Sequence, residues 1–81
     1  MDLKLTTKRA LEYEERTGKD ILIFIQEIAK TEKITIKEVI DLFLAMGENY
    51  TIEDFDKWDI SLTEKITEIM NAVKEYTQGK K

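Results

Sequence analysis

The stretch TIKEVIDLFLAMG, residues 35–47, decides what kind of fold this chain adopts. Thr35 and Glu38 have the spacing of a capping box, in which each side chain bonds the backbone N–H of the other residue. Apolar residues then recur at helical spacing as far as Gly47, where we expect a left-handed helix end. They cover about 200° of the helix circumference, roughly twice the width of an ordinary surface stripe. We therefore predict a central helix that neighbours cover on several sides. The residues left to face water are Lys37, Glu38, Asp41 and Ala45.

Length and composition limit the remaining possibilities. The 81 residues suffice for one domain, which we place at 1–78, and for a disordered tail at 79–81. The chain has no cysteine and no histidine, so disulfides, thiolate zinc sites and the commonest general base are absent. The longest unbroken apolar run, Ile21–Ile25, is far shorter than the ~20 residues that span a bilayer, and the first residues lack the apolar core of a signal peptide. These features predict a soluble protein of a reducing cytoplasm with no membrane partner.

The net charge of −4 is unevenly distributed along the chain. Residues 1–40 carry eight basic and eight acidic side chains, whereas residues 41–81 carry five basic and nine acidic ones. Binding to nucleic acid phosphates needs clustered Lys and Arg, which this acidic half does not offer. We therefore expect no nucleic acid partner.

Four further helical segments flank the central one. We expect helices over about 8–17, about 21–31, about 52–58 and about 62–77, because each begins after a capping residue. The expected caps are Thr6 or Thr7, Asp20, Thr51, and Ser61 paired with Glu64. Leu3 and Leu5 lie before them in a short extended arm that is free to pack on a neighbour. Four or five short helices with short links predict an all-α, orthogonal or bundle-like fold.

The helix patterns also predict which side chains are buried. The first helix has a thin apolar face of Ala10, Leu11 and Tyr13, with Glu14 on the same face. The second has Ile21, Phe24, Ile25, Ile28 and Ala29 on one face. The last has the narrow face Leu62, Ile66, Ile69, Met70, Val73 and Tyr76.

No group of residues predicts catalysis or metal binding. An EF-hand loop starting at Asp54 needs glycine at its sixth position and glutamate at its twelfth, but Asp59 and Lys65 stand there. Glu14 is best explained by an ion pair with Lys8 or Arg9, or by hydrogen bonds that it accepts from the start of another helix, because no second acting group accompanies it for catalysis. We therefore expect a protein that is not an enzyme and that has no catalytic residues, metal or cofactor.

Some apolar residues suggest contact with another protein. Ile23 lies among polar residues on the outer face of its helix, where a partner or a neighbouring subunit would cover it. Phe55 and Trp58 lie three residues apart, so they are either core attachments of their helix or aromatic anchors for a partner.

The opening third resembles the start of the small tail assembly chaperones of siphophages and prophages. The similarity lies in a leucine-threonine arm (Leu5, Thr6), a helix with Ala10-Leu11-Glu12-Tyr13-Glu14-Glu15, and then Gly18-Lys19-Asp20-Ile21. The later segments Thr35–Ile40 and Thr51–Phe55 also resemble helix starts of that family.

This resemblance implies a non-enzymatic, all-helical protein of the bacterial host cytoplasm. It would self-associate and coat the tape-measure protein, which is long and helical, while the tail assembles. Lacking the family's longer acidic linker and tail, this chain would be the short form, beside a longer product of ribosomal frameshifting. The expected partner-binding residues are Ile23, Leu42, Leu44, Met46, Phe55 and Trp58.

Two alternatives stay open on the sequence alone. One is an unrelated helical regulator or protein-interaction module that binds one partner helix. The other is a DNA-binding helix-turn-helix formed by 21–31 and 35–46, whose second helix offers only Lys37 to phosphates, against Glu38 and Asp41.

Overall fold

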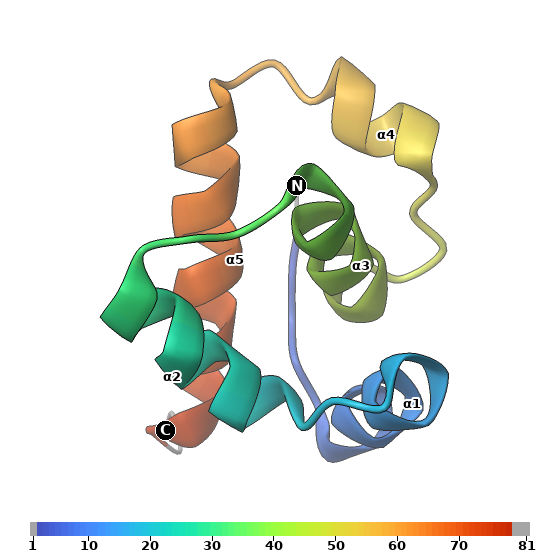
Figure 1. Cartoon of the computed structure of the whole chain (residues 1–81). Coiled ribbons are helices and arrows are strands. Elements are labelled where there is room, and N and C mark those ends of the chain that lie inside the picture. Colours follow the sequence, from blue (N-terminus) through green and yellow to red (C-terminus); the bar gives the residue numbers. More distant parts are fainter. Residues whose placement is uncertain (1, 79–81) are drawn as a thin grey trace.

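Five α-helices make up the computed structural model, which describes residues 2–78 (Figure 1). Within these residues the only β pairing is one antiparallel bridge between Leu3 and Gly47. The predicted all-α class is therefore confirmed, whereas the expected tail at 79–81 lies outside the described residues. The helices are α1 Thr7–Thr17, α2 Ile21–Thr31, α3 Ile36–Met46, α4 Ile52–Lys57 and α5 Leu62–Thr77.

Side-chain caps explain where the helices begin. The Thr6 side chain accepts a hydrogen bond from the Arg9 N–H, and Asp20 accepts from the first turn of α2. Reciprocal capping boxes open α3 (Thr35 and Glu38), α4 (Thr51 and Asp54) and α5 (Ser61 and Glu64). Each cap satisfies backbone N–H groups that a helix start leaves without partners. The predicted starts are thus confirmed to within one residue.

Helix α3 is the central element, as predicted. It packs against α1, α4 and α5, which lie around it in Figure 1. Phe43 of α3 is fully buried, and the rings of Tyr50, Phe55 and Trp58 lie 5.4, 5.1 and 5.7 Å from its ring, centroid to centroid. The aromatic side chains that follow α3 therefore fold back onto it and fasten α4 to the core.

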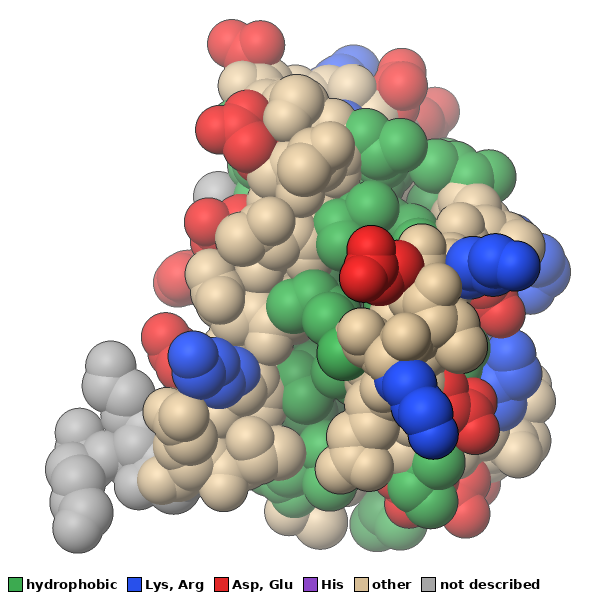
Figure 2. Space-filling model, turned by 60° about the vertical axis from the view of Figure 1, so that its left-hand side comes forward, with side chains coloured by type: hydrophobic (Ala, Val, Ile, Leu, Met, Phe, Trp, Pro, Cys, Tyr) green, Lys and Arg blue, Asp and Glu red, His purple; other side chains and the backbone are tan. Residues whose placement is uncertain are grey.

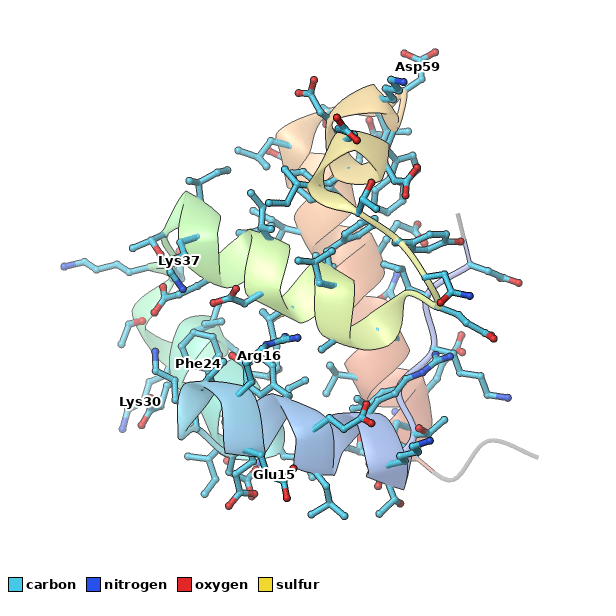
Figure 3. All side chains as sticks on the ribbon, turned by 90° about the vertical axis from the view of Figure 1, so that its right-hand side faces the viewer. Glu15, Arg16, Phe24, Lys30, Lys37 and Asp59 are labelled. Carbon is cyan, nitrogen blue, oxygen red and sulfur yellow. The ribbon has the colours of Figure 1, made fainter. Side chains whose placement is uncertain are left out.

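Contacts between α1 and α3 are partly polar. Arg16 of α1 points toward α3, where its Nη2 donates a hydrogen bond of 3.2 Å to the backbone oxygen of Asp41 (Figure 3). Nearby, Lys19 Nζ lies 3.1 Å from Glu38 Oε2 and 4.4 Å from the centroid of the Phe24 ring. The contact of Lys19 with Glu38 joins the link between α1 and α2 to the first turn of α3.

Two predictions about the faces of α3 were wrong. Ala45, expected to face water, is buried, because three other helices pack around α3 and cover even a single methyl group. Ile36, expected in the apolar arc, is 54 % exposed, because it follows the largely exposed link 31–35.

The end of α3 also differs from the prediction. Gly47 has φ −99° and ψ 130°, which is extended rather than left-handed backbone. The chain leaves α3 in this conformation because it pairs at once with Leu3. Among the described residues, left-handed backbone occurs instead at Gly18, Glu32 and Asn49.

The N-terminal arm, residues 2–5, packs on its own chain instead of a neighbour. Leu5 is 3 % exposed and Leu3 is half-buried against the core. The Lys4 N–H donates to the Met46 carbonyl at 3.0 Å, and Arg9 Nη1 donates to the carbonyls of Lys4 and Met46 at 2.7 and 3.1 Å. Arg9 thus fastens the arm to the end of α3.

On the other helices the central residues of the predicted apolar faces are buried, but several residues at the borders of these faces are not. Leu11 and Leu62 are 57 % and 46 % exposed, and Ala29 and Glu14 are also exposed. Lys65, which the pattern of α5 placed outside the apolar face, is buried, with its Nζ 4.6 Å from the centroid of the Phe55 ring. Attraction between the ammonium group and the ring compensates for the lost hydration.

Candidate interaction surface

Three of the six residues expected to bind a partner lie in the core. Leu42, Met46 and Phe55 are 1 %, 0 % and 6 % exposed. Leu42 and Met46 face the helices that pack around α3, and Phe55 packs edge-on against Phe43. The expectation that these three side chains offer a free surface was wrong, because a small domain needs them to build its interior.

The other three do not form one surface. Ile23 is 57 % exposed on α2, whereas Leu44 of α3 and Trp58 at the end of α4 are half-buried against the core. Within the described residues, the backbone of α2 lies close to α1 and α5, whereas no Cα atom of α2 lies within 8 Å of one in α3 or α4. Contact of Ile23 with a partner stays a prediction.

A different candidate surface, which Ile23 does not line, lies between α2 and α5. A groove of about 380 Å³ separates the two helices, and Figure 2 shows hydrophobic side chains along this seam. Its floor is formed by Ile25 and Val73, which are buried, and its walls by Leu22 and Met70, which are half-buried. We call this feature the α2–α5 groove.

Polar side chains complete the lining of the α2–α5 groove. They are Gln26 on α2 and Asn71, Lys74 and Thr77 on α5. Lys74 is the one ionised side chain in this lining, although the whole chain carries a net charge of −4. The groove therefore combines an apolar floor with a single positive charge on one wall.

A second hollow, whose lining includes the carboxylates of Glu14 and Asp20, adjoins the α2–α5 groove on the side of α1. It measures about 120 Å³ and shares Leu22 with the α2–α5 groove. Leu11 of α1 and the ring of Tyr76 also line it, and the Tyr76 hydroxyl lies 2.8 Å from Thr7 Oγ1. The exposed Leu11 and the half-buried Leu22 and Met70 thus lie on one connected face.

The titratable groups with shifted pKa values serve the fold. Burial raises the pKa of the Tyr13 phenol. The N–H of Thr35 and then the ammonium of Lys19 lower the pKa of the Glu38 carboxyl. Neither Tyr13 nor Glu38 lines the α2–α5 groove, so both shifts belong to helix packing and capping.

Between residues 2 and 78, no three His, Cys, Asp or Glu side chains are grouped so that they could hold a metal ion. None of the five helices combines the length and the apolar character required to cross a bilayer.

Comparison with protein-family models, curated proteins and solved structures found no match to this chain. The α2–α5 groove is therefore identified from its geometry alone. The sequence did indicate its parts, since Ile25 and the pair Met70 and Val73 fall on the predicted apolar faces of their helices. The neighbourhood of α2 and α5 could not be predicted, because thirty residues separate them along the chain.

Proposed function

We propose that this protein is a binding module that holds an amphipathic helix of a longer protein in the α2–α5 groove. The observation that carries the proposal is the groove itself, with Leu22 and Met70 standing half-exposed above a buried floor of Ile25 and Val73. A third helix laid between α2 and α5 would cover these walls. Capture of an apolar helix face in a groove between helices is a common mode of peptide recognition.

Charge specifies the bound helix further. Lys74 provides a positive charge beside the apolar floor, and the exposed surface of α5 beyond it carries Glu68 and Glu75. A partner helix with one carboxylate at the edge of its apolar stripe would pair with Lys74. A carboxylate placed toward Glu68 or Glu75 would be repelled, so charge favours a partner helix whose acidic flank lies beside Lys74.

The resemblance noted in the sequence names a class of partner. We infer that the protein acts as a tail assembly chaperone, which coats a tape-measure-like, long helical protein in the cytoplasm of a bacterial host cell. A coat needs many copies of the protein, each of which holds one segment of the long partner. Each copy needs only a modest affinity for its segment, because the binding free energies of successive copies add along the partner. A non-enzymatic role and self-association are parts of this proposal.

The test has two stages. In the first, the genes beside this one are read for a tail-tube protein and for a very long helical protein. In the second, overlapping fluorescent peptides of that long protein are titrated with this chain, and fluorescence anisotropy is measured. We expect at least one peptide to bind with a dissociation constant of about 1–100 μM. Leu22→Glu and Met70→Glu should each weaken that binding at least about tenfold, because they place a charge on an apolar contact.

A matched control distinguishes the groove from general hydrophobicity. Ile52 on α4 is 58 % exposed and does not line the groove, so Ile52→Glu should leave binding unchanged. If Ile52→Glu weakens binding as much as Met70→Glu does, the groove is not the binding site. If the neighbouring genes encode no long helical protein, the chaperone role is refuted.

A further inference from the structure

Glu14 is a carboxylate that the fold does not use. It is exposed on α1, and within residues 2–78 it takes part in no ion pair, so the pairing expected with Lys8 or Arg9 is absent. It lines the second hollow, the one of about 120 Å³ that adjoins the α2–α5 groove. Its charge is therefore free to pair with a bound molecule.

Asp20 adds a second carboxylate to the same hollow. Its Oδ1 accepts hydrogen bonds from the N–H groups of Leu22 and Ile23 at 2.9 and 3.2 Å, which caps α2. Its Oδ2 accepts no hydrogen bond from the residues that the structure describes. None of the described residues that line this hollow is lysine or arginine, so the lining is acidic as well as apolar.

Lys74 gives the adjoining α2–α5 groove the opposite charge. It is exposed, and its ammonium takes part in no ion pair in the described part of the chain. The two hollows share Leu22, and the helices that line them meet in the lower half of Figure 1, away from α4. One connected apolar face therefore has a positive charge on its α5 wall and negative charges on the side of α1.

We propose that the helix held in the α2–α5 groove extends over the second hollow, where its lysine or arginine pairs with Glu14 and Asp20 while its acidic residue pairs with Lys74. This inference rests on the function proposed above and adds the charge pattern and the orientation of the partner. A helix with an acidic residue at one end of its apolar stripe and a basic residue at the other then lies in one direction. The reverse direction brings like charges together.

The fold keeps the two charged ends in place. The hydroxyls of Thr7 and Tyr76 lie 2.8 Å apart and join α1 to the end of α5. Tyr13 of α1 and Ile21 of α2 are each 2 % exposed, so both helices are fastened to the core beside the second hollow. A surface whose charges are already positioned selects a partner without a large cost of ordering.

Each charge contributes more to specificity than to affinity. Exposed ion pairs are weak, so removal of one should raise the dissociation constant only about twofold to fivefold. Reversal of the bound helix replaces attraction by repulsion at both ends. We therefore expect the favoured direction to be populated at least about tenfold more than the reverse one.

A synthetic amphipathic helix tests the orientation. The peptide has about 18 residues, which exceeds the length below which isolated helices are marginal. It carries a leucine stripe, one glutamate near the N-terminal end of the stripe, one lysine near the C-terminal end, and alanine and glutamine elsewhere. A nitroxide is attached to either end, and the broadening of the amide NMR signals of this chain is measured.

The nitroxide at the lysine end should broaden the amides of Leu11 and Glu14 most strongly. The nitroxide at the glutamate end should broaden those of Asn71 and Lys74 most strongly. A second peptide with the two charges exchanged should give the opposite pattern, because its chain then lies in the opposite direction.

Charge removal tests the two carboxylates directly. Glu14→Gln/Asp20→Asn removes both negative charges, and asparagine keeps the cap of α2. By fluorescence anisotropy, this variant should bind the first peptide with a dissociation constant about threefold to tenfold higher than that of the wild type. Glu12→Gln/Glu27→Gln is the matched control. It removes two exposed carboxylates from the same two helices, and neither lines either hollow, so its binding should stay within about twofold of the wild type.

The outcomes separate this inference from the function on which it rests. Equal broadening of both sets of amides by a nitroxide at one end would overturn the orientation, and so would an unchanged dissociation constant of Glu14→Gln/Asp20→Asn. In both cases the peptide is still bound, so the α2–α5 groove would stand. A peptide that does not bind at all would refute the groove and this inference together.

Discussion

The ring of Tyr50 lies against Gly47 and fills the space that a side chain at Gly47 would need. The same ring stacks on Phe43, with 5.4 Å between the centroids, and its hydroxyl accepts a hydrogen bond from the Asp2 N–H. The backbone of Gly47 is extended, a conformation that any residue can adopt. Glycine is therefore required at this position because the Tyr50 ring leaves no room for a Cβ atom. Tyr50 thus joins the end of α3, the aromatic core and the N-terminal arm.

Gly47→Ala should lower the free energy of unfolding by about 1–3 kcal/mol, because the added methyl group displaces a packed ring. Chemical denaturation of Gly47→Ala, Tyr50→Ala and the double variant measures this effect. In the Tyr50→Ala background the cost of Gly47→Ala should disappear. Gly18→Ala is the control: it should cost about 1 kcal/mol in either background, because φ is +76° there and no atom is in the way. An equal cost of Gly47→Ala in both backgrounds would contradict the contact.

Phe43→Ala should lower the free energy of unfolding by about 3–5 kcal/mol. Phe43 is fully buried and three aromatic rings pack around it, so truncation leaves a cavity that none of them can fill without losing other contacts. Thermal unfolding followed by circular dichroism measures the loss. Ile52→Ala, at an exposed position of α4, should change stability by less than about 0.5 kcal/mol. A melting temperature of Phe43→Ala equal to that of the wild type would refute the central role of α3.

Ile23→Asp should keep the fold, whereas Leu42→Asp should unfold the chain. Ile23 is 57 % exposed, so the carboxylate stays hydrated, but Leu42 is 1 % exposed and would bury a charge without a partner. Helix content and melting temperature of the two variants distinguish them. Unfolding of Ile23→Asp would show that Ile23 belongs to the core.

Acid should remove the part of the stability that Glu38 provides. The Thr35 N–H and the Lys19 ammonium lower the pKa of Glu38 in the folded chain, so the folded state favours the ionised form. This contribution is complete above the unfolded pKa, near the ordinary value of 4.5, and is lost as the pH falls through the lower folded pKa.

Glu38→Gln should therefore flatten the dependence of stability on pH between about 3 and 5, since glutamine keeps the capping hydrogen bond but does not titrate. Urea unfolding at a series of pH values measures the slope. Glu53→Gln changes an exposed carboxylate outside the capping boxes and serves as the control. Identical slopes for wild type and Glu38→Gln would contradict the assigned role of Glu38.

Helix positions could be predicted from the sequence because their signals are local. Thr35 with Glu38, and Ser61 with Glu64, act across three residues, so each pair marks a helix start whatever surrounds it. The wide apolar arc of α3 likewise predicted a helix with several neighbours, and α1, α4 and α5 pack on it.

Which apolar side chains remain at the surface could not be read in the same way. A helical pattern gives the direction of a side chain, but burial depends on how many other elements lie in that direction. Leu42 and Met46 therefore lie in the core, although the wide apolar arc of their helix suggested that they were free to bind a partner. Leu11 and Ile36, in contrast, are exposed. The sequence by itself determined the class of fold and the bounds of its helices, since those depend on residues three or four apart. The tertiary structure alone decided the α2–α5 groove, the burial of Lys65 beside Phe55 and the bridge between Leu3 and Gly47, because each depends on residues that only folding brings together.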